Sequence, residues 1–185
     1  MSILRLVFSG SGGQGVITAA VILAETAVIF EGKNATQTQA YGAAARGGAT
    51  RSDMIISDEN INYPGVIQPN ILVTLTQDAY NSFSDIIRPG GLLLTDPKFV
   101  ETARKVDAKK LELPMHELVM EKIGKPIVYN ICMLGTLIGI TGLVKPESVL
   151  KVLAKRIPED FLAMNERALD IGLTLGGQYQ YRIGQ

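Results

Sequence analysis

A glycine-rich turn between two apolar segments constrains the fold of this chain more than any other feature. The turn, Gly-Ser-Gly-Gly-Gln-Gly at residues 10–15, follows the apolar run Ile3 to Phe8 and precedes the apolar stretch Val16 to Phe30. This order predicts a strand, a tight loop and a helix that starts at the loop. Its G-x-G-x-x-G spacing permits positive φ angles and lets a phosphate approach the backbone. We therefore expect this turn to meet an anion or another backbone.

Strand-like and helix-like segments alternate along the chain, which predicts an α/β fold. Further strands are expected at Asn34 to Gln39, Ser52 to Ser57, Ile71 to Thr76 and Leu92 to Thr95. Helices are expected at Gly13 to Phe30 and Ala79 to Ile87, and three more start near Pro126, Pro146 and Pro158. The apolar strand runs indicate a central parallel sheet. The expected architecture is a three-layer, Rossmann-like, mostly parallel sheet flanked by helices, with the helical C-terminal third packing on it. With no repeat or linker visible, residues 1–185 are expected to form one domain.

Composition limits the classes of partner. The formal net charge is zero, so the overall charge suggests neither nucleic acid nor an anionic membrane as a partner. The single cysteine, Cys132, excludes an internal disulfide framework, an iron–sulfur cluster and a thiolate zinc site within this chain. The predicted first strand begins at the N-terminus. The residues there show neither the basic region nor the apolar region of an export signal. We therefore expect a cytoplasmic protein.

One segment resembles a membrane span in length. Ile127 to Val144 is uncharged for 18 residues, which is close to the minimum for a transmembrane helix. Polar side chains and glycines dilute its hydropathy, so a buried helix fits better. Gly135 and Gly139 form a small-x-x-x-small face that lets another backbone pack closely, inside this domain or across an interface.

A dinucleotide site lacks its usual acidic residue. Rossmann sites place an acid about 20 residues past the glycines, at the end of the second strand, to bind the ribose hydroxyls. Here no acid occurs between Glu31 and Asp53, which argues against NAD. A site for a mononucleotide or a phosphate remains open, because it needs only the turn and the helix N-terminus. No Gly-Lys-Ser/Thr follows the glycines, so the turn is not a P-loop.

A second glycine-containing segment, Tyr-Gly-Ala-Ala-Ala-Arg-Gly-Gly at residues 41–48, follows the second strand. In a doubly wound sheet it would lie at the same carboxyl edge as the first turn. The Arg46 guanidinium suits bidentate capture of a carboxylate or phosphate. The alternative is that Arg46 only tethers the loop, with Asp53 as its internal partner. The candidate ligand-binding residues are Gly10, Ser11, Gly12, Gly13, Gln14, Gly15, Tyr41, Arg46, Gly47 and Gly48.

No self-sufficient catalytic set or metal site is visible. His116, the only histidine, lies in a charged region without acidic or cysteine companions at ligand spacing, so a surface or helix-start position is expected. Cys132 lies in the long apolar segment, where a packed thiol is expected. Ser9 and Ser11 have no base placed to activate them. We therefore assign no catalytic residue to this chain.

Taken together, four features resemble the gamma subunit of 2-oxoacid:ferredoxin oxidoreductases over nearly the whole chain. They are the Gly-Gly-Gln-Gly turn after a strand, Tyr41 with Arg46-Gly47-Gly48, Gly90-Gly91 before a strand, and Asn130 with Leu134-Gly135. Within that family the chain looks most like the gamma subunit of the 2-oxoglutarate enzymes. Pyruvate, 2-oxoisovalerate and indolepyruvate versions are close in pattern.

The resemblance implies a share in oxidative decarboxylation, in which a 2-oxoacid and coenzyme A give acyl-CoA and carbon dioxide while electrons pass to ferredoxin. It implies alpha and beta partner subunits, and a ferredoxin-like delta subunit in some complexes. These partners are expected to carry thiamine diphosphate and the [4Fe-4S] clusters. The gamma domain is associated with the coenzyme A side of the site, and the isolated chain is expected to be inactive.

Two readings of other classes remain. The chain could be a freestanding Rossmann-like nucleotide-binding protein, which would bind a dinucleotide on its own. It could also be a pure assembly scaffold whose glycine turn only packs, which would bind no ligand and co-purify with larger subunits.

Overall fold

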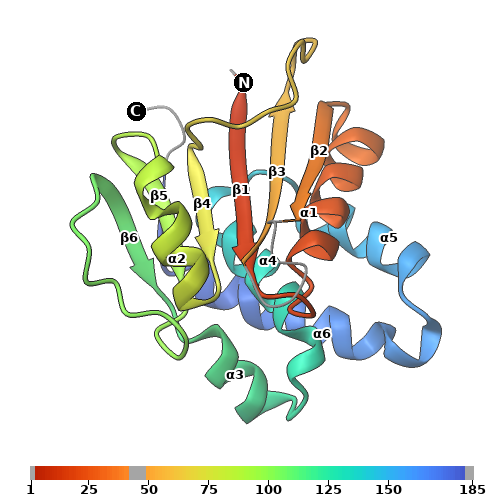
Figure 1. Ribbon diagram of the computed structural model, residues 1–185. Helices are drawn as coiled ribbons and strands as arrows, with labels where there is room; N and C mark the ends of the chain where they lie inside the picture. Colours follow the sequence, from red (N-terminus) through yellow and green to blue (C-terminus); the bar gives the residue numbers. More distant parts are fainter. Residues whose placement is uncertain (1–2, 42–48, 182–185) are drawn as a thin grey trace.

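The computed structural model describes residues 3–41 and 49–181, which form one six-stranded sheet with helices on both faces (Figure 1). The strands are β1 (Leu4–Gly10), β2 (Asn34–Tyr41), β3 (Thr50–Ser57), β4 (Ile71–Thr74), β5 (Gly91–Thr95) and β6 (Ala108–Glu112). The α-helices are α1 (Val16–Glu25), α2 (Gln77–Phe83), α3 (Met115–Lys122), α4 (Tyr129–Thr141), α5 (Pro146–Arg156) and α6 (Glu159–Gly176). A π-helix, η1 (Thr26–Phe30), extends α1, and the 3-10 turns η2 (Ser84–Ile86) and η3 (Pro126–Val128) follow α2 and precede α4.

The sheet has the strand order β2-β3-β1-β4-β5-β6. Strands β1, β4, β5 and β6 pair in parallel, whereas β3 is antiparallel to both of its neighbours, β1 and β2. Strand β2 therefore runs in the same direction as β1, and the carboxyl ends of these two strands lie at one edge of the sheet. The expected α/β architecture with a mostly parallel sheet is confirmed.

The two faces of the sheet are covered unequally, and β1 shows this by its alternation. Leu6 and Phe8 belong to a large core that includes residues of α1, α4, α5 and α6, whereas Val7 belongs to a smaller core with Tyr80 of α2. Figure 1 shows α2 in front of the sheet and α4 and α6 behind it. One face is therefore buried under several helices, and the other lies under one short helix and loops.

The long uncharged segment forms the buried helix α4, which packs against α6. The backbones approach so closely that a Cβ on Gly135 would lie 2.4 Å from the Leu169 carbonyl oxygen, and one on Gly172 would lie 2.1 Å from that of Cys132. The small-x-x-x-small face is thus used inside this chain. None of the helices in the described part of the chain combines the length and apolar character needed to cross a membrane.

Two regions differ in detail from the sequence-based expectation. The first helix was expected to start at Gly13, but α1 begins at Val16 and changes to π geometry at Thr26. The predicted elements do not include β6 and α3, which lie in the charged region around His116. In β6 only Leu111 is buried, because an edge strand needs few apolar side chains.

Candidate functional site

The side chain of Gln14 closes the glycine turn. Its Oε1 accepts a hydrogen bond from the Ser11 backbone N–H at 2.8 Å, and its Nε2 donates to the Leu75 carbonyl, just past β4, at 3.2 Å. A Cβ on Gly10 would lie 2.4 Å from Gln14 Oε1. Gly10 is therefore needed to admit the glutamine, and the glutamine ties the turn to the neighbouring strand.

The end of the turn is held from the other side by α4. Gly15 has φ 72° and is the N-cap of α1. Its carbonyl oxygen accepts a hydrogen bond from Nδ2 of Asn130 at 3.2 Å, and a Cβ here would lie 2.5 Å from that nitrogen. Both the positive φ and the close approach require glycine at this position. The turn is thus clamped between β4 and α4.

The middle of the turn is left open to solvent. Gly12 and Gly13 are exposed, and a Cβ on Gly12 would meet no atom within 4 Å. Helix α1 starts without a side-chain cap and has no acidic residue in its first turn. Such a terminus presents unpaired N–H groups and a partial positive charge, which favour an anion.

Two cavities flank the turn. One of about 380 Å³ lies over Ser11, Gly12 and the first turn of α1 and reaches Thr50. The other, of about 340 Å³, lies beside Gly13 and Gln14 and reaches the start of α4. Gly13 and Gly15 line both cavities, so a ligand larger than either cavity could cross the backbone of the turn.

The second predicted segment starts and ends next to the first. Tyr41 of β2 and Gly10 of β1 are both in register with Thr50 of β3, so Tyr41 and Thr50 lie at the edge of the sheet that carries the glycine turn. This confirms the expected shared edge for the ends of the segment. Arg46, Gly47 and Gly48 lie outside the described residues.

Asp53, the internal partner considered for Arg46, forms an ion pair with Arg51. Arg51 Nη2 donates to Oδ2 of Asp53 at 3.0 Å, and the Val66 backbone N–H donates to the same oxygen at 3.2 Å. Arg51 is two residues away from Asp53 in β3 and therefore lies on the same face of the strand.

Sequence reasoning missed an aromatic cluster at the same edge, formed by Phe99, His116 and Tyr129. The centroid of the His116 ring lies 5.0 Å from that of Phe99 and 5.6 Å from that of Tyr129. All three rings line the 340 Å³ cavity. The only signals in the sequence were the lone histidine at a helix start and the end of a predicted strand at Asp96.

The buried carboxylate of Asp96 organises this cluster. Its Oδ2 accepts hydrogen bonds from the His116 backbone N–H at 2.7 Å and from the Tyr129 hydroxyl at 3.0 Å. Burial, together with the adjacent Asp96 charge, raises the pKa of Tyr129, so the phenol stays protonated and keeps donating. Asp96 thus joins the end of β5 to the starts of α3 and α4.

The thiol of Cys132 packs in the core and has no catalytic or ligand role in this chain. Cys132 is fully buried in α4, and burial raises the pKa of its thiol to about 12. One buried cysteine cannot ligate a [4Fe-4S] cluster. Within residues 3–41 and 49–181 no three His, Cys, Asp or Glu side chains gather as metal ligands would.

The chain is similar to several known proteins over most of its length. The model of the pyruvate ferredoxin/flavodoxin oxidoreductase family matches residues 5–175. The 2-oxoglutarate synthase subunit KorC of Methanocaldococcus jannaschii is 45% identical over 153 residues, which is 82% of each chain. The keto/oxoacid ferredoxin oxidoreductase gamma subunit of Geobacter sulfurreducens superposes with a TM-score of 0.87 at 35% identity, covering 96% of this chain and 98% of that one.

A larger solved protein contains the same fold. It is the 2-oxoglutarate:ferredoxin oxidoreductase of Magnetococcus marinus, whose structure holds 2-oxoglutarate, coenzyme A and succinyl-CoA. The match has a TM-score of 0.86 at 21% identity and covers 96% of this chain but 32% of that chain. At this identity the likeness concerns the fold alone.

Proposed function

The chain belongs to the pyruvate ferredoxin/flavodoxin oxidoreductase family as a gamma-type subunit, and we propose that its complex converts 2-oxoglutarate and coenzyme A to succinyl-CoA and carbon dioxide, with electrons passing to ferredoxin. The choice of 2-oxoglutarate rests on the KorC relative at 45% identity. We further propose that residues 1–185 are one gamma-type domain that works in the cytoplasm.

In this proposal the chain positions coenzyme A and performs no bond chemistry. The observation that carries it is the clamped turn with an open middle: Gln14 and Asn130 hold its two ends, while Gly12 and Gly13 stay exposed. Backbone N–H groups at the start of α1 would donate to a phosphate oxygen of coenzyme A. Because the turn is held in place, little ordering is required when the ligand binds.

The second segment would supply the fixed charge. Its ends lie beside the turn, since Tyr41 and Gly10 share the register position of Thr50. We propose that Arg46 pairs with a phosphate of coenzyme A and that Tyr41, Gly47 and Gly48 complete the site with Gly10 to Gly15. The 340 Å³ cavity under the aromatic cluster would receive an apolar or aromatic part of the ligand.

The catalytic groups would come from partner subunits. We propose that the alpha and beta subunits, with a ferredoxin-like delta subunit where one is present, carry thiamine diphosphate and the [4Fe-4S] clusters. The single buried cysteine supports this division. Thiamine diphosphate supplies the carbanion chemistry of decarboxylation when it is bound.

Arg46→Ala in the reconstituted complex tests the proposed role. Loss of an ion pair to phosphate should raise the KM for coenzyme A by about 10- to 100-fold, while the KM for 2-oxoglutarate and the assembly of the subunits stay unchanged. If the chain were a pure scaffold, Arg46→Ala would reduce the assembly of the subunits, and the complexes that do form would keep the wild-type KM for coenzyme A. Tight binding of NAD by the isolated chain would favour a freestanding nucleotide-binding protein.

A further inference from the structure

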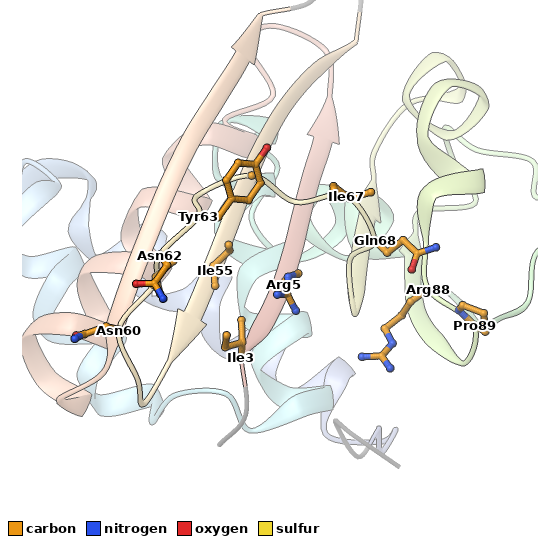
Figure 2. Close-up of a pocket in the computed structure, with 12 residues that line it drawn as sticks. Ile3, Arg5, Ile55, Asn60, Asn62, Tyr63, Ile67, Gln68, Arg88 and Pro89 are labelled. Atoms are coloured by element: carbon orange, nitrogen blue, oxygen red, sulfur yellow. The ribbon is translucent and has the colours of Figure 1, made fainter.

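A cavity lies at the edge of the sheet opposite to the glycine turn. It measures about 710 Å³ and is lined by the start of β1, the segment 60–68 that crosses in front of the sheet, and the turn before β5 (Figure 2). Cavities of 300 to 1,000 Å³ are the usual size of small-molecule sites, as a rough guide. Nothing in the proposed coenzyme A site uses this cavity.

Arg5 places a cation among apolar side chains at the floor of this cavity. The alternation of β1 puts Arg5 on the same face as Ile3 and Val7. Val7 belongs to the smaller core, and Ile3 packs against it. The Arg5 backbone is fixed by Asn70, whose side-chain oxygen accepts from the Arg5 N–H at 3.0 Å and whose N–H donates to the Arg5 carbonyl at 2.8 Å. The strand therefore projects the half-buried side chain from a rigid point.

The Arg5 guanidinium has no counter-charge in the part of the chain that the structure describes: no carboxylate there lies within ion-pair distance. Arg51, which is also half-buried, shows the usual arrangement, because it pairs with Asp53 and donates to the Val66 carbonyl. Burying a cation is costly when no partner compensates it. An external anion would supply the compensation that Arg5 lacks.

A second unpaired arginine faces the same space. Arg88 is exposed and lines the cavity, and Figure 2 shows its guanidinium turned toward Arg5 and away from Pro89. Among the described residues it has no carboxylate partner either. None of the described residues that line the cavity is acidic, and three of them carry amide side chains: Asn60, Asn62 and Gln68.

We propose that this cavity is a binding site for a small organic anion that carries carboxylate or phosphate groups. Guanidinium groups can donate paired hydrogen bonds to two oxygens of a carboxylate or a phosphate. The amide side chains can donate further hydrogen bonds. Ile3, Ile55 and Ile61 offer an apolar floor for the carbon skeleton. A small ligand fits better than a protein segment, because the Arg5 side chain is half-buried on the sheet surface and not on an exposed rim.

Amide proton–nitrogen NMR spectra of the full chain, titrated with pyrophosphate and separately with succinate, test this site. We expect saturable shifts of amides in residues 3–7, 60–68 and 88–91 with at least one probe, and the probe that binds tells phosphate from carboxylate as the source. Arg88→Gln, and Arg5→Met in a second variant, should weaken that binding about 10-fold. Arg167→Gln, at an exposed arginine of α6 outside the cavity, is the matched control and should leave it unchanged.

The site would be refuted if neither probe shifts these amides at millimolar concentration, or if Arg88→Gln and Arg167→Gln bind equally well. If the signals of these amides shift only when partner subunits are added, the cavity is a subunit interface, and the proposal would also be overturned. Shifts of residues 11–18 report separately on the glycine turn, so failure of this site and failure of the proposed coenzyme A site are distinguishable.

Discussion

Asn130, at the start of α4, donates a hydrogen bond from Nδ2 to the carbonyl oxygen of Gly15 at 3.2 Å and fills the space where a Cβ of residue 15 would be. The two residues are 115 positions apart in the chain. Their contact ties the N-cap of α1 to the buried helix α4. The shape of the candidate site therefore depends on the core behind it.

Gly15→Ala should destabilise the protein. The alanine would have to adopt φ 72° and would lie 2.5 Å from the Asn130 amide, so we expect the free energy of unfolding to fall by about 2 to 4 kcal/mol. Urea denaturation followed by circular dichroism measures this change. Gly12→Ala is the matched control, because its Cβ would meet nothing within 4 Å. Equal stability of the two variants would contradict the clamp.

Gln14→Leu should loosen the glycine turn. It leaves the Ser11 N–H and the Leu75 carbonyl without their partner, which we expect to cost about 1 to 3 kcal/mol of unfolding free energy. Hydrogen exchange of the Ser11 amide should become faster in the variant. Gln178→Leu, at an exposed position, controls for the change of residue type. A Ser11 amide as protected as in the wild type would show that Gln14 does not hold the turn.

Gly172→Ala should disrupt the contact between α4 and α6. The new Cβ would lie 2.1 Å from the Cys132 carbonyl oxygen, and backbone in a packed helix pair cannot yield as a side chain can. We expect a loss of about 1 to 3 kcal/mol of unfolding free energy, although alanine favours a helix over glycine by about 1 kcal/mol. Thr174→Ala, at an exposed site of α6, should be close to neutral. A Gly172→Ala protein as stable as wild type would refute this packing.

Cys132 should make stability fall at alkaline pH. Burial raises the pKa of its thiol from 9.0 to about 12, so the unfolded chain releases this proton at lower pH than the folded chain. The contribution is therefore fully present below pH 9 and is lost as the pH rises towards 12. Denaturation midpoints measured across this range should decline less steeply in Cys132→Ala. Identical pH slopes for the two proteins would contradict the assignment.

The parts of the fold that sequence patterns predict are those with local signals. The strand–turn–helix at Gly10 to Gly15 and the proline-initiated helices α5 and α6 are examples, because their start signals lie within a few residues. The burial of α4 was also predictable. An uncharged segment of 18 residues that does not cross a membrane must be buried in the protein core.

The features that were missed depend on contacts between distant residues. The antiparallel direction of β3 is set by its pairing with β1 and β2, and an apolar strand run does not encode direction. The cluster of Phe99, His116 and Tyr129 forms because Asp96 binds the starts of two helices at once. The unpaired state of Arg5 likewise appears only when its surroundings are known.

We propose that the open middle of the glycine turn holds an anionic part of coenzyme A, so a negative charge placed there should weaken the binding of coenzyme A. Gly12→Asp and Gly12→Asn fill the same open space and differ mainly in charge. In the reconstituted complex we predict that Gly12→Asp raises the KM for coenzyme A about 10-fold relative to Gly12→Asn, with the KM for 2-oxoglutarate unchanged. Equal KM values for coenzyme A in the two variants would show that no anionic part of coenzyme A lies at Gly12.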